Sequence, residues 1–419
     1  MLAKPKSEFG RNVLVLLTGT TVAQAIPIAI SPILTRIYTP EDFGVLALFL
    51  AITAIFGSIS SGRYELAIML PERDEDAINI FALGTIINLA ISTILLLAVV
   101  LFHQNIVSLT GNAEIGKWLY FVPISVFLTG FYNNLTYFST RKKFYKDVAN
   151  SVILKAIILA IFQLSIGLLK TGAAGLVGGN IVSQFFANTK LLQNVVKDKN
   201  LLSAISRSEI KAHARKYRNF PKYSIWAALA NTLSKNLTNL LISLFYGVAT
   251  LGHYSIVQRV LGMPSALIGG AIGQVFFQQA SIEKKETGCA AKSFDGTVKR
   301  LVVIGLPVFT GLFFFVEDIF AFAFGEQWRI AGTYAQLLVP YFFANFVVGT
   351  VSQINAVFEK QAYGLYLNLL LLFVSMSTIY VSHNSLVPFQ YYLIGYTVCM
   401  SLTYTAIFFY FRSVSRGRM

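Results

Sequence analysis

Three basic residues lie deep inside apolar runs long enough to span a membrane. Lys235 falls near the middle of its run, whereas Arg259 and Lys155 each lie about two helical turns after the first residue of their runs. A charge at the bilayer centre costs about 2.5–3.5 kcal/mol on insertion scales, so such residues usually serve function. No acidic residue lies as deep in any run. We expect Lys235 to face a water-filled cavity that accepts an anion such as phosphate or pyrophosphate. Lys155 and Arg259 are further candidates for substrate binding, and the alternative for these two is that they snorkel.

In the first run, and again in the seventh, polar residues recur at spacings that place them on one face of a helix. Asn231 and Asn239 lie four residues before and after Lys235, and Gln24 and Ser31 are seven residues apart. Residues at these spacings lie on one side of a helix. We expect all four to contribute to substrate binding. The alternative is hydrogen bonding between helices, a common role of Ser, Asn and Gln in membranes.

Charged residues also gather close to the ends of the early runs. Glu41 and Asp42 follow the first run, near Arg36, and Glu65 follows Arg63 by two residues. The carboxylates could pair with the arginines in gates, or they could bind a coupling ion, H+ or Na+. The alternative is the ordinary charge found in loops and at helix ends.

Signatures of soluble enzymes and metal sites are absent from the sequence. Cys289 and Cys399 are too far apart in sequence to suggest a metal or disulfide frame, and the four histidines are scattered. No Gly-rich phosphate loop, Ser/His/Asp set or paired outer carboxylates occur. We therefore expect no catalytic residues, no metal site and no cofactor other than a coupling ion.

The composition is that of a membrane protein with many spans. Of 419 residues, 55% are hydrophobic and 13% are charged, and the net charge is +15. A soluble fold could not cover so much apolar surface with so few charges. In a soluble protein the positive charge would suggest nucleic acid, but in a membrane protein it reflects retention of cations in the cytoplasm. We expect no nucleic-acid partner.

The apolar runs number twelve, six on each side of a long polar stretch. The first run follows Lys4, Lys6 and Arg11, but it is too long for a secretory signal, so we interpret it as an uncleaved span. The runs cover residues 13–37, 43–61, 77–102, 117–138, 148–169, 173–191, 222–246, 253–277, 298–316, 331–357, 364–381 and 388–411.

The distribution of basic residues predicts the orientation. With the N-terminus inside, 27 of the 34 Lys and Arg residues fall on inner segments, and four fall on outer ones. Such asymmetry is typical of a cytoplasmic N-terminus, and an even number of spans returns the C-terminus to the same side. The outer residues are Arg36, Lys117, Lys170 and Arg329. We expect a multi-pass protein of the bacterial cytoplasmic (inner) membrane with both termini in the cytoplasm.

Weak internal similarity indicates a repeat. A shift of 208 residues places Tyr38 on Tyr246 and Gly44 on Gly252. Six spans per half would give both halves the same orientation, as in transporters built from parallel repeats. The predicted fold is an all-α polytopic membrane protein of about twelve helices in two six-helix lobes around a central cavity. The predicted parts are an N-terminal lobe over 1–200, a cytoplasmic linker over 201–221 and a C-terminal lobe over 222–419.

Two segments near the N-terminus carry a resemblance to a known family. ILTRIYTPEDFG over 33–44 and SGRYELAIML over 61–70 resemble the O-antigen flippases (Wzx type) and related polysaccharide biosynthesis proteins of the multidrug/oligosaccharidyl-lipid/polysaccharide exporter superfamily. Arg36 and Arg63 belong to the matching segments.

The resemblance implies both a substrate and a mechanism. A flippase of this kind moves an undecaprenyl-pyrophosphate-linked oligosaccharide, an O-antigen repeat unit, from the cytoplasmic to the periplasmic leaflet by ion-coupled alternating access. The implied partners are that glycan, membrane lipids and, in the same pathway, a polysaccharide polymerase and a chain-length regulator. The protein would then be a transporter of lipopolysaccharide biosynthesis and not an enzyme.

Two other functions are compatible with parts of the sequence. A small-molecule or drug exporter of the same superfamily would be favoured by a dominant acidic pair in the cavity, and none occurs in the runs. A membrane polysaccharide polymerase would be favoured by a large outer loop or an inner catalytic domain with carboxylates. The short loops between the runs favour neither alternative.

Overall fold

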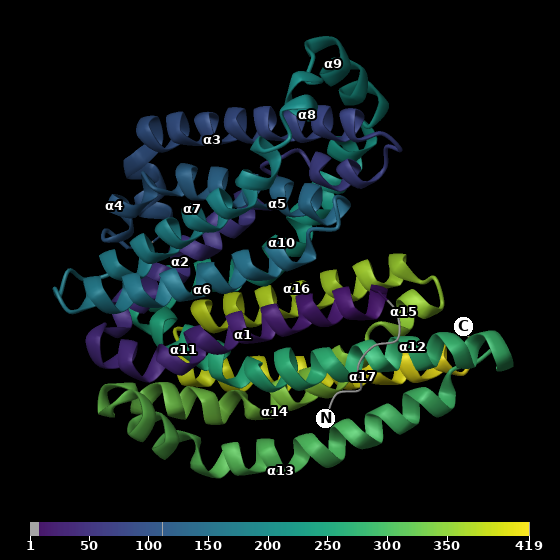
Figure 1. The fold of residues 1–419 in the computed structure, drawn as a ribbon. Helices are drawn as coiled ribbons and strands as arrows, with labels where there is room; N and C mark the ends of the chain where they lie inside the picture. The colour runs from purple at the N-terminus through teal and green to yellow at the C-terminus, as the bar shows by residue number, and fades with distance from the viewer. Residues whose placement is uncertain (1–7, 111, 419) are drawn as a thin grey trace. The chain divides into compact units, whose positions relative to one another are not determined.

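The computed structural model describes residues 8–110 and 112–418, and every regular element within these ranges is a helix (Figure 1). The predicted cytoplasmic N-terminus, with Lys4 and Lys6, lies outside the described residues. The chain divides into two compact units, one ending at Val248 and the other beginning at Ala249.

Each of the twelve predicted apolar runs coincides with a long helix or with a pair of consecutive helices. The first unit contains α1 (Glu8–Ile37), α2 (Pro40–Gly57), α3 (Asp74–Thr110), α5 (Val122–Arg141), α6 (Tyr145–Gly167), α7 (Ala174–Val196) and α10 (Ile225–Tyr246). The second contains α11 (Val248–Pro264), which continues through the π-helical turn η3 (Ser265–Gly269) into α12 (Gly270–Thr287), then α13 (Ala291–Phe324), α14 (Arg329–Val351), α16 (Gln361–Asn384) and α17 (Phe389–Ser415).

Shorter helices connect these elements. They are η1 (Tyr64–Met69), α4 (Ile115–Leu119), α8 (Lys199–Ser203), α9 (Arg207–Lys216), η2 (Phe220–Ser224), η4 (Glu326–Trp328) and α15 (Ile354–Val357). Among the described residues, nine helical segments are long and apolar enough to cross a membrane. The remaining long helices, α5, α7 and α10, have 20, 23 and 22 residues. The prediction of an all-α polytopic membrane protein is confirmed.

The turn from α1 to α2 is fixed by hydrogen bonds at both helix ends. Thr39 and Asp42 form a reciprocal capping box at the start of α2, with Pro40 at its first position. Both arrangements favour helix initiation. The Tyr38 hydroxyl donates to the carbonyl of Gln163 on α6 at 2.6 Å, and a Cβ on Gly175 of α7 would collide with that hydroxyl. The turn therefore anchors α1 and α2 against α6 and α7.

The third helix is longer than a bilayer requires. A kink at Phe102 divides its 37 residues, and the part before the kink, from Asp74, spans about 42 Å at 1.5 Å per residue, against a hydrocarbon core of about 30 Å. Its N-terminal turn carries Asp74, Glu75 and Asp76, which suit the positive end of the helix dipole. Asp74 also accepts hydrogen bonds from Arg141 at 2.9 Å and Lys142 at 2.6 Å, at the end of α5. One end of α3 therefore extends into a polar layer.

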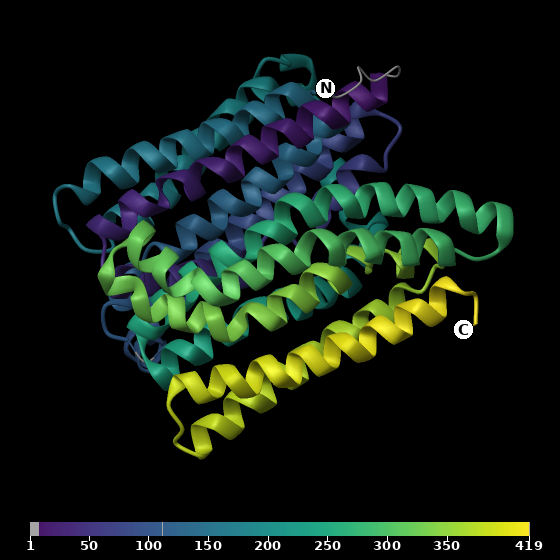
Figure 2. The same ribbon diagram turned by 90° about the horizontal axis from the view of Figure 1, so that it is seen from below.

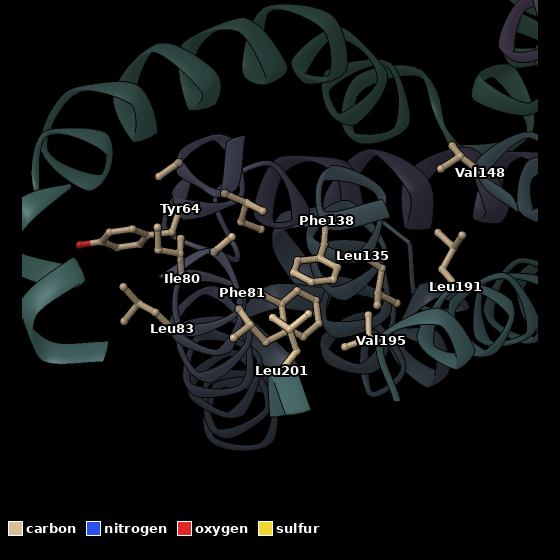
Figure 3. Packing of buried hydrophobic residues seen from close by; sticks show 14 residues of the cluster. Tyr64, Ile80, Phe81, Leu83, Leu135, Phe138, Val148, Leu191, Val195 and Leu201 are labelled. Atoms are coloured by element: carbon tan, nitrogen blue, oxygen red, sulfur yellow. The ribbon is translucent and has the colours of Figure 1, made fainter. Parts of the chain in front are cut away.

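A cluster of buried hydrophobic residues packs this end of the first unit. Figure 3 shows Phe81 of α3 against Phe138 of α5, with Val195 of α7 and Leu201 of α8 close by. The rings of Phe81 and Phe138 lie 5.7 Å apart. Side chains of α9 pack against the same cluster, so α3, α5, α7, α8 and α9 share one core.

The seventh long helix, α10, packs within the first unit. A Cβ on Gly44 of α2 would lie 1.9 Å from the carbonyl oxygen of Val248, so only glycine allows this approach. Ser243 of α10 donates a hydrogen bond to the carbonyl of Thr110 at the end of α3. The compact units therefore divide after α10, whereas the sequence places the linker before it. The predicted lobe boundaries stay a prediction.

The second unit is organised around α14. Helices α13 and α17 both pack against α14, and Figure 2 shows α16 and α17 side by side. Its core is unusually rich in tyrosine. Tyr341 of α14 lies 5.3 Å from Tyr396 and 5.9 Å from Tyr404 of α17 between ring centroids. Such rings supply a large apolar area together with polar hydroxyl groups.

Candidate functional site

A polar stripe runs along α10 where the sequence predicts a substrate face, and its contact with substrate stays a prediction. Asn231 and Lys235 are both exposed, four residues apart on the same side of the helix. Asn239, one turn further on, is half-buried, and its side-chain oxygen is buried without a hydrogen-bond partner among the described residues. Lys235 forms no ion pair within the described part of the chain. The stripe therefore offers a positive charge and amide groups that no neighbouring side chain neutralises.

Lys155 has a different environment. It is half-buried on α6, and its Nζ lies 5.9 Å from the centroid of the Tyr132 ring on α5. Tyr132 is positioned in turn by a hydrogen bond of 2.9 Å with Ser151. The face of an aromatic ring attracts a cation, and the attraction grows as water is removed. Packing between α5 and α6 thus accounts for this lysine without an anionic ligand.

Arg259 and a polar pocket belong to the second unit. Arg259 is half-buried on α11. A pocket of about 280 Å³ lies beside the π-helical turn that follows α11, and Ser265, Asn345, Thr350 and Gln353 line it with several glycines. Turns of this kind often occur at functional sites. The polar lining comes from the π-helical turn, from α14 and from Gln353, which follows α14.

The two polar residues of α1 that the sequence predicts to bind substrate differ in exposure. Gln24 is exposed, whereas Ser31 is 2% exposed and donates to the carbonyl of Pro27 at 2.6 Å. Two prolines, Pro27 and Pro32, lie inside this helix, and each removes a backbone donor. The placement of Ser31 favours a packing role, and substrate contact by either residue stays a prediction.

The second family segment forms a buried ion pair. Arg63 and Gly62 both adopt left-handed backbone conformations, with φ of 63° at each, in the turn between α2 and η1. This turn brings Nη1 of Arg63 to 3.0 Å from Oε1 of Glu65. The Glu65 side chain is 4% exposed, and its Oε2 is buried without a hydrogen-bond partner. Burial raises the pKa of the Glu65 carboxyl, and the charge of Arg63 opposes that shift.

The first family segment serves mainly to shape the helix turn. The carboxylate of Asp42 caps α2, while Glu41 and Arg36 are exposed. Burial, and to a lesser extent the charge of Asp42, raises the pKa of Tyr38 to about 12. An acid and an arginine thus pair at Arg63 and Glu65, and a role of these residues in a gate stays a prediction.

Sequence reasoning missed a group of buried asparagines in the first unit. Asn88, Asn134 and Asn188 lie on α3, α5 and α7 and are at most 4% exposed. The amide groups of Asn88 and Asn188 donate to the carbonyls of Phe127 and Leu128. Each of the three asparagines keeps a buried side-chain oxygen without a partner among the described residues. Their position within apolar runs was a signal that could have found them.

A basic pocket lies at the end of the first unit that carries α8. Its volume is about 520 Å³, and Lys142, Lys197 and Lys199 line it together with Asp198. Three lysines around one acid leave a net positive lining, although Lys142 also binds Asp74. The three lysines are among the basic residues that the sequence places on inner segments.

Comparison with protein families identifies the chain. The model of a polysaccharide biosynthesis protein family (Polysacc_synt_3) matches residues 33–332, which is more than half of the chain. The chain belongs to this family. The resemblance noted over 33–70 is therefore confirmed, and the match extends from the end of α1 into α14.

The chain is similar in sequence to one transport protein of polysaccharide biosynthesis. The succinoglycan biosynthesis transport protein ExoT of Rhizobium meliloti (strain 1021) is 22% identical over 311 residues. The match covers 72% of this chain and 59% of the relative, so the chain spans less than two thirds of that protein.

Solved structures give the same fold at low sequence identity. The lipid II flippase MurJ in an inward closed conformation is 15% identical, with a TM-score of 0.72 over 95% of this chain and 86% of that one. An inward-facing multidrug resistance MATE family transporter of the MOP superfamily is 14% identical, with a TM-score of 0.67 over 94% of each chain. The chain therefore has the same fold as these two proteins, and it is a multi-pass membrane protein of a polysaccharide biosynthesis family.

Proposed function

We propose that the protein flips an undecaprenyl-pyrophosphate-linked oligosaccharide from the cytoplasmic to the periplasmic leaflet of the bacterial inner membrane. The observation that carries this proposal is the family match over residues 33–332 on a chain with a transporter fold. The protein moves a headgroup and neither makes nor breaks a covalent bond. The glycan is an O-antigen repeat unit or the repeat of a related surface polysaccharide, as the similarity to a succinoglycan transport protein suggests.

The charge of the spans supports an anionic headgroup. Lys155, Lys235 and Arg259 are the basic residues deep inside the predicted runs, and no carboxylate lies as deep. The ring of Tyr132 already accounts for Lys155, which leaves Lys235 and Arg259 for the headgroup. A pyrophosphate that leaves water needs cations and hydrogen-bond donors in place of its hydration shell. Lys235 offers the charge, and Asn231 and Asn239 on the same face of α10 offer amide donors that also suit sugar hydroxyls. We assign the first contact with the headgroup to this stripe.

We assign ion coupling to the buried carboxyl of Glu65, within the second family segment. Alternating access opens the path to one side of the membrane at a time, and a gradient must supply the direction. Glu65 has the burial, the single cationic neighbour Arg63 and the raised pKa that a proton-binding carboxyl requires. Protonation would release Arg63 from the pair and so change the charge of this turn.

Reconstitution tests the proposal. The purified chain is placed in proteoliposomes that contain a synthetic undecaprenyl-pyrophosphate-linked oligosaccharide, and an impermeant glycosidase or lectin reports the glycan in the outer leaflet. Accessibility should rise with time and respond to an imposed pH or sodium gradient. If protein-free and protein-containing vesicles exchange the lipid at equal rates, the proposed function is wrong.

Cysteine labelling tests the location and orientation. Cys289 and Cys399 are first replaced by serine, and single cysteines are then placed at the exposed Ser203 and Ser385. In intact cells, an impermeant maleimide should label Ser385→Cys, in the predicted periplasmic loop, and should leave Ser203→Cys unlabelled. The reverse pattern would contradict the cytoplasmic termini.

A further inference from the structure

The helix α9 is fastened to the N-terminal end of α3 by specific hydrogen bonds. Asn79 of α3 donates to the carbonyl of Ala204 at 2.9 Å and accepts from the backbone N–H of Ser206 at 2.9 Å. The Tyr64 hydroxyl donates to the carbonyl of Ala214 at 3.0 Å. In Figure 1, α9 lies beyond α8 at this end of α3. Residues far apart in the sequence are thus held in one place.

Three potential metal ligands meet at this junction. Asp76 belongs to the first turn of α3, and Glu209 and His213 lie one turn apart on α9. One ligand atom from each lies within 4.8 Å of the others. Nε2 of His213 is 3.4 Å from Oδ1 of Asp76 and 3.8 Å from Oε2 of Glu209.

The imidazole of His213 is the least satisfied member of the group. Its side chain is 7% exposed, and neither ring nitrogen has a hydrogen-bond partner among the described residues. Burying a polar group without a partner costs roughly 1–3 kcal/mol. Nε2 faces two carboxylates and yet is aligned for a hydrogen bond with neither, as expected when all three groups point at a common centre.

We propose that Asp76, Glu209 and His213 bind a divalent transition-metal ion of the zinc type. Ligand atoms at about 2.0–2.2 Å from a tetrahedral ion lie about 3.3–3.6 Å from one another, close to the two distances at His213. The ligand set of one imidazole and two carboxylates suits borderline ions such as Zn²⁺ and lacks the thiolate that favours Cu⁺. The two negative charges balance the charge of the ion, and water completes the coordination.

The site is open to solvent on one side. The side chains of Glu209 and Asp76 are 53% and 29% exposed, so an ion can enter from the aqueous phase. Bound metal joins α9 to α3 through ligands from both helices, in addition to the hydrogen bonds of Asn79. This role is independent of the transported substrate. The expectation of no metal site rested on sequence spacing, which does not reveal that α3 and α9 are neighbours.

Metal binding to the purified full-length chain in nanodiscs tests the proposal. The protein is stripped with a chelator, dialysed and titrated with Zn²⁺ by calorimetry, and Co²⁺ is used as a spectroscopic probe. We expect one ion per chain and visible Co²⁺ absorption. Loss of a ligand in Asp76→Asn, Glu209→Gln or His213→Asn should weaken binding by more than about 10-fold.

A matched variant separates the site from general surface charge. Glu75 adjoins Asp76, but it pairs with Arg73 at the surface, so Glu75→Gln should bind Zn²⁺ as the wild type does. If His213→Asn disturbs folding, Glu209→Gln still tests the site, because Glu209 is exposed and its substitution should leave the fold intact.

Proteolysis supplies a second readout. The basic residues of α9 are exposed trypsin sites. Zn²⁺ should slow cleavage there in the wild type and in Glu75→Gln, but not in Asp76→Asn. Absence of saturable binding to the wild type would overturn the proposal, as would equal affinities in Glu75→Gln, Asp76→Asn and Glu209→Gln.

Discussion

Two lysines of the first unit occupy the same kind of sequence position and differ in their surroundings. Both lie inside apolar runs, and neither has a carboxylate in its own run. Lys155 on α6 is half-buried over the ring of Tyr132, whereas Lys235 on α10 is exposed beside Asn231. An in-span charge alone is therefore an incomplete sign of a substrate site, because one of these two cations already has a favourable contact within the protein.

The comparison assigns different roles to the two residues. The contact between Lys155 and Tyr132 joins α5 to α6, so its loss should appear in stability. Among the described residues Lys235 has no ring or ion-pair contact of this kind, so its loss should appear in transport. The predictions below test this difference from the largest effect to the smallest.

Neutralising each lysine should separate transport from packing. Lys235→Gln should reduce transport by at least about 10-fold, equivalent to about 1.4 kcal/mol, because a desolvated pyrophosphate loses its counter-charge. Transport by Lys155→Gln, at equal protein level, should stay within about twofold of the wild type. The contact of Lys155 stabilises the fold, so its loss should lower the amount of protein and not the transport by each molecule. Surface polysaccharide in a flippase-deleted strain measures transport, with membrane protein level as the control. Equal losses of transport in the two variants would contradict the different roles assigned to Lys235 and Lys155.

A double-mutant cycle should detect the contact at Lys155. Lys155→Met and Tyr132→Leu together should be less destabilising than the sum of the single changes, with a coupling energy of about 0.5–2 kcal/mol. Tyr132→Phe keeps the ring and should retain most of the coupling. Thermal unfolding in detergent measures these energies. The matched cycle of Lys235→Met with Tyr132→Leu should give no coupling, and a similar value in both cycles would contradict the assignment.

The buried carboxyl at Glu65 should give a smaller effect that depends on pH. Its folded pKa is raised above the unfolded value of about 4.3, so the folded state binds the proton more tightly. The associated stability is present at low pH and is lost as pH rises through the folded pKa. Unfolding temperatures measured between about pH 5 and about pH 8 should therefore fall less in Glu65→Gln than in the wild type.

An exposed carboxylate provides the control for that experiment. Glu41 lies on the surface at the start of α2. Glu41→Gln should keep the pH dependence of the wild type. If Glu65→Gln keeps it too, the carboxyl does not take up a proton in this range, and the ion-coupling role proposed for it is lost.

The fold was predictable from the sequence because span length and apolar content are local properties. Each predicted run coincides with a helix. Thr39 and Asp42, which precede an apolar run, form a capping box at the start of α2. Even so, α3 begins three residues before its apolar run of 77–102 and continues for eight residues after it, past a kink at Phe102. Hydropathy detects the part of a helix inside the bilayer and not the polar turns that continue it.

The candidate site was only partly predictable because it depends on contacts between distant segments. Nothing in the spacing of Lys155 indicates that Tyr132 lies beneath it. The approach of His213 to Asp76 likewise requires α9 to dock on α3, more than 130 residues away in the sequence. The stripe of Asn231 and Lys235 was predictable, because both residues lie on one helix and the 3.6-residue period places them together.

A charge series at Lys235 tests the central claim most directly. Lipid-linked glycan transport is compared in Lys235→Arg and Lys235→Glu, by proteoliposome accessibility and by surface polysaccharide, at matched protein levels. The account predicts that Lys235→Arg retains most activity, because it keeps the charge and still donates hydrogen bonds to phosphate, although its fork geometry differs. It predicts that Lys235→Glu is inactive, because a second negative charge repels the pyrophosphate. Full transport by Lys235→Glu would contradict the anionic headgroup contact on α10.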